Sequence, residues 1–156
     1  MILNRQRGVR VPVRELDKFL GRALRRLRLS QKSLSVCLVG NTEIAGWNRA
    51  YRGKKGPTDV LSFATYGPRS KHHKRARNTS DLEPFSSTSS ASYLGDIAIA
   101  PAVARRNARR FGRTFTDEMR ILILHGILHL MGYDHETDNG EMDRREQRLR
   151  RALRLA

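Results

Sequence analysis

Three histidines lie in or beside the most apolar stretch of the chain, within residues 124–135. His125 and His129 are four residues apart, so a helix would place both rings on one face, with about 6 Å between the Cβ atoms. Gly132 can leave helical geometry, which lets the chain turn back and bring His135 to the same point. Neutral imidazole suits zinc, and three protein ligands leave a fourth position for water. We therefore predict one Zn²⁺ per chain, with His125, His129 and His135 as its ligands.

The alternative is that these are ordinary core histidines without a ligand. The segment is apolar on nearly every side, which is typical of a buried helix. Its apolar residues are Ile121, Leu122, Ile123, Leu124, Ile127, Leu128, Leu130 and Met131. A buried imidazole without a partner costs about 1 to 3 kcal/mol. Two such rings on one face, with a third just beyond, multiply that cost and favour a metal site.

The run HGILHLMGYDH over residues 125–135 resembles the signature H-G-x-L-H-L-x-G-Y-D-H of the YbeY family. Two further stretches are similar to family motifs and occur in the same order. Residues 48–54 and 57–63 match the block N-R-x-Y-R-x-K followed by P-T-D-V-L-S-F, and residues 94–97 match L-G-D-I. The resemblance extends from about Leu34 to about Glu146, although Phe63-Ala64-Thr65 departs from the family's usual F-P-F.

This resemblance implies an α/β, zincin-like domain. Its small mixed four-stranded sheet would pack with about five helices, and the histidine helix would run through the core. The implied function is a single-strand-specific, metal-dependent endoribonuclease in ribosomal RNA processing, at the 3′ end of the small-subunit RNA, and in ribosome quality control. Ribosomal RNA and the small ribosomal subunit are then the expected partners.

Two other functions remain open from the sequence. One is a non-catalytic RNA-binding or ribosome-binding assembly factor whose zinc is structural. The other, a zinc metallopeptidase, is disfavoured because Gly126 stands where the H-E-x-x-H motif carries its general base. The sequence identifies no general base for either kind of hydrolysis.

Four further residues are candidates for the site. Arg52 is similar to the family's motif arginine, and we predict that it contacts phosphate, with a surface ion pair as the alternative. Asp59 and Asp96 fall near strand ends or turns, where they could cap backbone groups or orient the site. Asp134 could accept a hydrogen bond from a ligand imidazole or serve as a turn residue.

Hydrophobic periodicity predicts the elements that must position these residues. An amphipathic helix is expected over residues 13–29, a strand over 34–39, a helix over 42–51 capped by Thr42, and strands over 59–63 and 94–100. The helical connection between the first two of these strands predicts that they pair in parallel. A helix from Pro101 to Gly112 should bury Phe111, Thr116 should cap the histidine helix, and a last helix should span 139–155.

Length and composition indicate a single domain over residues 1–156, with Cys37 as a small buried side chain. Lys and Arg outnumber Asp and Glu by 31 to 15, a charge of +16 that favours RNA or another polyanion as partner. No apolar run reaches the roughly 18 residues of a membrane span, so we expect a cytoplasmic protein. Residues 66–93 are polar and serine-rich and are expected to be a flexible insertion, whose basic part over 69–77 could hold RNA.

Overall fold

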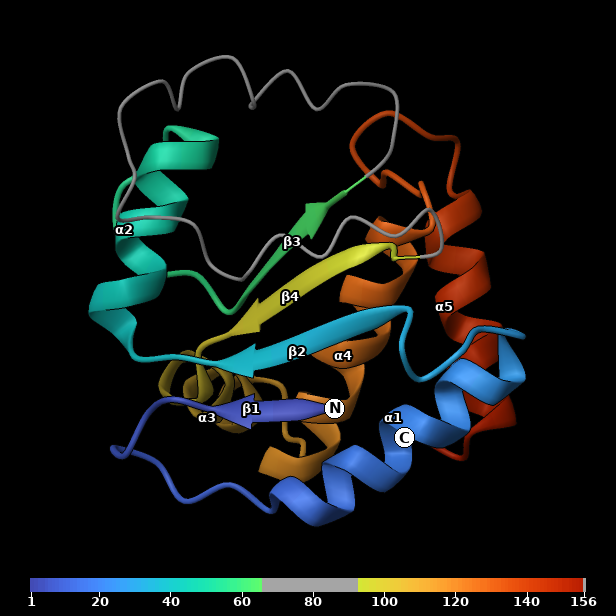
Figure 1. Cartoon of the computed structure of the whole chain (residues 1–156), viewed down its shortest axis with the longest axis horizontal. Helices are drawn as coiled ribbons and strands as arrows, with labels where there is room; N and C mark the ends of the chain where they lie inside the picture. The colour runs from blue at the N-terminus through green and yellow to red at the C-terminus, as the bar shows by residue number, and fades with distance from the viewer. Residues whose placement is uncertain (66–92, 156) are drawn as a thin grey trace.

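The structure is a computed structural model that describes residues 1–65 and 93–155. Within these residues a mixed four-stranded sheet carries five helices, which confirms the predicted α/β class (Figure 1). The elements are β1 (Ile2–Asn4), α1 (Val13–Arg26), β2 (Leu34–Leu38), α2 (Asn41–Arg52), β3 (Val60–Ala64), β4 (Gly95–Ile99), α3 (Pro101–Arg110), α4 (Phe115–Leu130) and α5 (Glu141–Ala152). Apart from Tyr93, the expected insertion and its basic part lie outside the described residues.

The strand order is β1-β2-β4-β3. Strands β1, β2 and β4 run parallel, and β3 runs antiparallel to β4 with Val60 opposite Ile99 and Ala64 opposite Gly95. The predicted parallel pairing of the strands over 34–39 and 59–63 is therefore wrong, because β4 lies between them. The connection through α2 leaves room between β2 and β3, and β4 later occupies that space. As an edge strand, β3 pairs only with β4, and it can do so in either direction.

Gly95 shows why β3 and β4 approach so closely at this end. Its backbone has φ of +146°, a region that side chains rarely adopt, and an added Cβ would lie 2.1 Å from the Phe63 carbonyl oxygen. The pairing of β3 with β4 therefore requires the glycine of the L-G-D-I motif.

The two faces of the sheet contribute to two core clusters. Alternate residues of β2 and β4, such as Val36 and Ile97, pack in a large cluster with the apolar sides of α1, α4 and α5. The residues between them, such as Cys37, pack with Trp47 and Ile44 of α2. The predicted burial of Cys37 is confirmed, and burial raises the pKa of its thiol to about 11, which keeps it unreactive near neutral pH.

Three local predictions near helix ends are wrong. Thr114, and not Thr116, caps α4, because its Oγ1 accepts a hydrogen bond from the Asp117 amide at 3.1 Å. Gly40 stands at the N-cap of α2, so Thr42 falls inside the first turn. Phe111 is 54% exposed because α3 ends one residue earlier, and the helical period that would have turned its ring inward stops there.

Helix α4 passes behind the sheet, with α1, α3 and α5 around it (Figure 1). Its side chains are buried on almost every side, as the apolar residues around the two histidines predict. No helix in the described part of the chain is both long enough and apolar enough to cross a membrane. Helix α4 lies close to the sheet at Gly126, where an added Cβ would lie 2.8 to 3.1 Å from side-chain carbons of Ile97.

This contact predicts that Gly126→Ala destabilises the fold. Overpacking a core costs about 1 to 3 kcal/mol, which exceeds the gain of up to about 1 kcal/mol in helix propensity. Gly46→Ala in α2 is the matched control, because nothing lies within 4 Å of the added methyl. Urea unfolding should give a lower midpoint for Gly126→Ala and an unchanged or higher midpoint for Gly46→Ala. A Gly126→Ala variant as stable as its control would contradict the close packing of α4 on β4.

Candidate metal centre

The end of α4 and the turn that follows it bring the three histidines together. The helix ends at Leu130, and Gly132 has φ of +99°, which reverses the chain. The Gly132 amide donates to the His129 carbonyl at 3.0 Å, which completes the last turn. The Asp134 carboxylate then accepts from the Glu136 amide at 3.0 Å. This second turn returns His135 toward the helix end.

The three imidazoles form a compact triangle. Their centroids lie 4.7 Å apart for His125 and His129, 5.3 Å for His125 and His135, and 5.2 Å for His129 and His135. One ligand nitrogen from each ring lies within 4.8 Å of the others. The Nε2 atoms of His125 and His129 are 3.1 Å apart. Two nitrogens at 2.0 to 2.1 Å from a tetrahedral zinc would be about 3.3 Å apart, so this spacing fits a shared ion.

Glu146 of α5 holds the His125 ring from the other side. Its Oε2 lies 3.3 Å from His125 Nδ1, and its Oε1 accepts from Arg150 Nη2 at 2.7 Å. If His125 donates its Nδ1 proton to this carboxylate, its Nε2 lone pair is free to face an ion. Burial acts to raise the pKa of the Glu146 carboxyl, but the hydrogen bonds from His125 and Arg150 outweigh it and hold that pKa below its ordinary value.

His129 is neutral at physiological pH. Burial, together with the neighbouring rings of His125 and His135, lowers the pKa of its imidazole to about 4. A histidine must be neutral to bind a metal ion, so this environment keeps His129 in its ligand form. The chemistry of the donor set, three nitrogens with one ring fixed by a carboxylate, fits a divalent metal ion.

Glu146 is a site residue that the sequence analysis missed. The signal was present in the spacing of Met142, Glu146 and Leu149, which places a carboxylate on the buried side of the last helix. A carboxylate on such a face needs a partner. The Glu146 carboxylate has two such partners, Arg150 on the next turn of the same helix and His125 on α4.

Two further predicted site residues, Arg52 and Asp134, lie close to the histidines in the structure. The Arg52 guanidinium, at the end of α2, lies 3.5 Å from the carboxylate of Glu136, the residue after His135. Asp134 forms the turn described above, and its charge is close enough to raise the pKa of His129 against the larger effects that lower it.

Asp59 and Asp96 have partners elsewhere. Asp59 accepts from the Val60 amide at 2.8 Å and from Asn107 Nδ2 at 3.1 Å, so it ties β3 to α3. Asp96 accepts from the hydroxyl of Tyr93, and burial raises the pKa of its carboxyl. Within residues 1–65 and 93–155, no hydrogen bond or ion pair joins either carboxylate to the three histidines.

The chain is similar to known proteins over nearly its whole length. A family model described as Endoribonuclease YbeY matches residues 1–154. A protein named Endoribonuclease YbeY from Sulfurovum sp. (strain NBC37-1) is 33% identical over 147 residues, covering 94% of this chain and 86% of the relative. One of the same name from Koribacter versatilis (strain Ellin345) is 36% identical over 155 residues, covering 99% and 86%. The solution structure of TM1509 from Thermotoga maritima is similar with a TM-score of 0.55 and 28% identity, covering 98% of this chain and 89% of that one.

We predict that Glu146→Gln weakens zinc binding about 10- to 100-fold, the usual cost of losing a carboxylate that orients a ligand histidine. Asp143→Asn is the matched control, since it neutralises an exposed carboxylate on the same helix. Competition with a chromophoric chelator measures both affinities. Equal affinities in the two variants would show that the Glu146 contact does not support metal binding.

The pKa of His129 also predicts how the stability of the metal-free chain depends on pH. Between the ordinary value of 6.5 and about 4, the folded state binds fewer protons at this ring than the unfolded state. The free energy of unfolding should therefore fall as the pH falls through this window. Urea unfolding at several pH values should show a weaker dependence in His129→Gln, which does not titrate there. An identical dependence in both proteins would argue against a depressed His129 pKa.

Proposed function

The chain belongs to the YbeY family, and on that premise we propose that it is a metal-dependent endoribonuclease that cleaves single-stranded RNA. The observation that carries the proposal is the convergence of His125, His129 and His135 at the end of a buried helix, with Glu146 fixing the first of them. The match to the family over residues 1–154 and the names of the relatives support the same activity.

We propose zinc as the ion, because three neutral imidazoles are a common ligand set for catalytic zinc. When bound, such an ion lowers the pKa of a water molecule and polarises a phosphoryl oxygen. The residues of the chain prepare this chemistry. Glu146 and Arg150 keep the His125 ring in one tautomer, and burial keeps His129 neutral.

We propose that Arg52 binds a phosphate of the substrate. Its ion pair with Glu136 is loose at 3.5 Å, and the two side chains are 36% and 60% exposed. A pair of this kind contributes little to stability, so the guanidinium can exchange Glu136 for a phosphate oxygen. A charge-assisted contact from arginine would then stabilise the negative charge that develops on the phosphoryl group.

The packing of Gly126 favours phosphodiester over peptide chemistry. In H-E-x-x-H peptidases the residue after the first histidine is the general base. Here that position lies against Ile97, with no room even for a methyl group. Replacing this glycine with glutamate would separate α4 from the sheet, so the fold itself disfavours the peptidase arrangement.

The family resemblance and the net charge of +16 guide the choice of substrate. We propose that the chain processes ribosomal RNA at the 3′ end of the small-subunit RNA and takes part in ribosome quality control. The small ribosomal subunit is then its partner, and the cytoplasm its place of action.

The test compares cleavage of a defined single-stranded RNA by the wild type, His129→Ala and Arg52→Gln, each freed of metal and reloaded with zinc. His129→Ala removes one of three ligands and should lose both stoichiometric zinc and cleavage while still binding RNA. Arg52→Gln should keep its zinc but cleave about 100- to 1000-fold more slowly, the usual cost of losing one transition-state contact.

Arg49→Gln is the matched control for Arg52, because it removes an exposed arginine from the same last turn of α2. It should cleave at close to the wild-type rate. Cleavage that persists unchanged in His129→Ala would come from a contaminating nuclease and would refute the proposed activity. Equal rates for Arg52→Gln and Arg49→Gln would refute the phosphate contact alone.

A further inference from the structure

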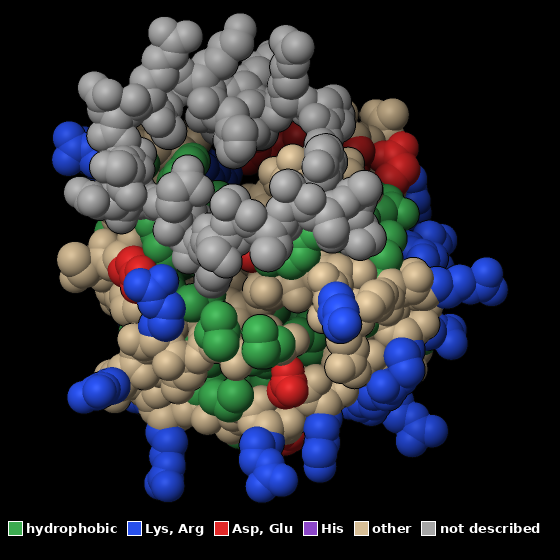
Figure 2. Space-filling model, in the orientation of Figure 1, with side chains coloured by type: hydrophobic (Ala, Val, Ile, Leu, Met, Phe, Trp, Pro, Cys, Tyr) green, Lys and Arg blue, Asp and Glu red, His purple; other side chains and the backbone are tan. Residues whose placement is uncertain are grey.

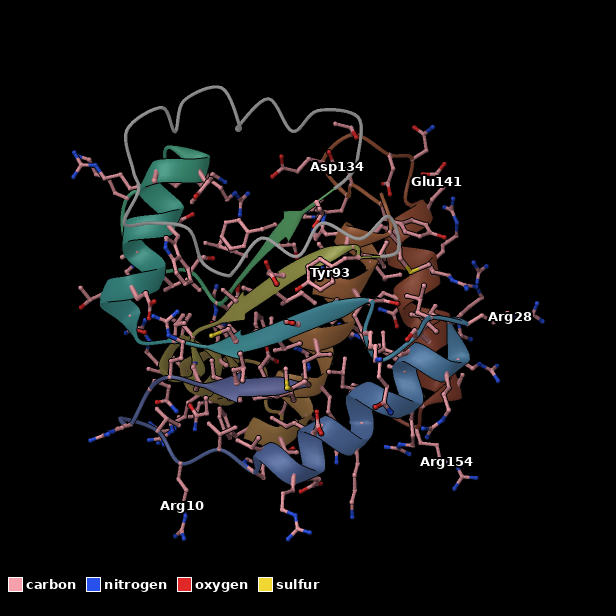
Figure 3. The ribbon with its side chains drawn as sticks, in the orientation of Figure 1. Arg10, Arg28, Tyr93, Asp134, Glu141 and Arg154 are labelled. Atoms are coloured by element: carbon pink, nitrogen blue, oxygen red, sulfur yellow. The ribbon has the colours of Figure 1, made fainter. Side chains whose placement is uncertain are left out.

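An open groove of about 580 Å³ lies between the C-terminal ends of α1 and α5. Four arginines and one leucine line it, namely Arg22, Arg25, Arg26, Arg28 and Leu153. Figure 3 shows Arg28 and Arg154 projecting outward at this side of the molecule, at the ends of the two helices. Lys and Arg side chains also gather along this edge in the space-filling view (Figure 2). The groove is separate from the three histidines.

The positive charge of the groove is not neutralised by the protein. In the part of the chain that the structure describes, no ion pair joins any of the four arginines to a carboxylate. All four are exposed. Arginines do complement the partial negative charge of a helix C-terminus, but two helix ends supply only about one negative charge together. Four guanidiniums therefore leave a surplus of positive charge that attracts an anion.

Two arginines on this side of the molecule have an unusual backbone conformation. Arg28 and Arg154 both have φ of +58°, in the left-handed region where glycine is the usual residue after a helix. In α1 the turn is closed by the Leu29 amide, which donates to the Leu24 carbonyl at 2.8 Å. Glycine would make this turn with less strain than arginine.

The groove and the candidate metal centre both include residues of α5 or of its C-terminal end. Leu153 lies seven residues beyond Glu146, the residue that contacts His125. At 1.5 Å per residue this is about 10 Å along the helix. The groove therefore lies at the end of the helix that also supports the candidate metal centre.

We propose that this groove binds backbone phosphates of the RNA strand that is cleaved at the metal centre. The planar guanidinium of arginine matches phosphate oxygens, and an exposed groove at a helix end accepts a flexible single strand. The proposal rests on the proposed endoribonuclease function and adds a second contact that holds the substrate.

The experiment measures RNA binding by fluorescence anisotropy over a range of salt concentrations. It uses the full chain without metal and a labelled single-stranded oligoribonucleotide of mixed sequence. Each phosphate contact to a single strand contributes about 0.7 to the slope of log affinity against log salt. The double variant Arg22→Gln with Arg26→Gln should therefore lower the slope by about 1.4, and it should bind about tenfold more weakly at physiological salt.

The double variant Arg105→Gln with Arg109→Gln is the matched control. It removes two exposed arginines of α3 that, like Arg22 and Arg26, are four residues apart. Its slope should stay near that of the wild type. Equal losses in both double variants would mean that only the overall charge matters, and would overturn the proposal. An unchanged affinity in the groove variant would overturn it too, and is the result expected if an acidic protein surface occupies the groove instead.

Arg28→Gly separates binding from folding. Glycine relieves the left-handed backbone, so the variant should unfold at the same or a higher urea concentration than the wild type, yet bind the oligoribonucleotide more weakly. Unaltered binding would exclude a role for Arg28 in the groove. The binding assay is done without metal, so it does not depend on cleavage. If the zinc-loaded wild type failed to cleave RNA in the separate cleavage assay, the proposed activity would be refuted without changing this binding result.

Discussion

Helix α4 is buried against the sheet and three other helices, yet it carries two imidazoles on one face. This is the constraint on which the site depends, because a polar ring in such surroundings must have a partner. The protein meets it by gathering the rings of His125, His129 and His135 at the C-terminal part of the helix and the turn after it, where the first two are half-buried and the third is exposed. Glu146 satisfies the remaining polar atom of the His125 ring from behind. We propose a shared metal ion as the common partner of all three rings.

The same geometry couples the site to the packing of the whole domain. Gly126 lets α4 lie directly on Ile97, which fixes the depth of the helix and so the height of the histidines. Gly132 reverses the chain at the other side of His129 and returns His135. Helix α5 must pack on α4 for Glu146 to reach its ring. The contact with the sheet, the turn after α4 and the packing of α5 thus together determine the position of one small group of nitrogens.

Much of this arrangement could be predicted from the sequence. The spacing of His125 and His129 on an apolar run contains both the helix and the shared face, and a glycine at 132 indicates the reversal. The direction of β3 could not be predicted, because periodicity shows that a segment is a strand but not which neighbour it joins. The caps at Thr114 and Gly40 were missed because several suitable residues stand close together at each helix start. Glu146 was missed because the apolar stripe and the arginines of the last helix do not by themselves show that a carboxylate lies on the buried side. Its partner His125 belongs to another helix.

X-ray absorption at the zinc edge of the purified full chain tests the central claim most directly, since it reports the ligands of the ion without reference to activity. The account predicts three nitrogen scatterers with the multiple-scattering pattern of imidazole at about 2.0 to 2.1 Å, together with one oxygen from solvent. A chain that binds no zinc, or a spectrum in which four protein ligands surround the ion, would contradict it.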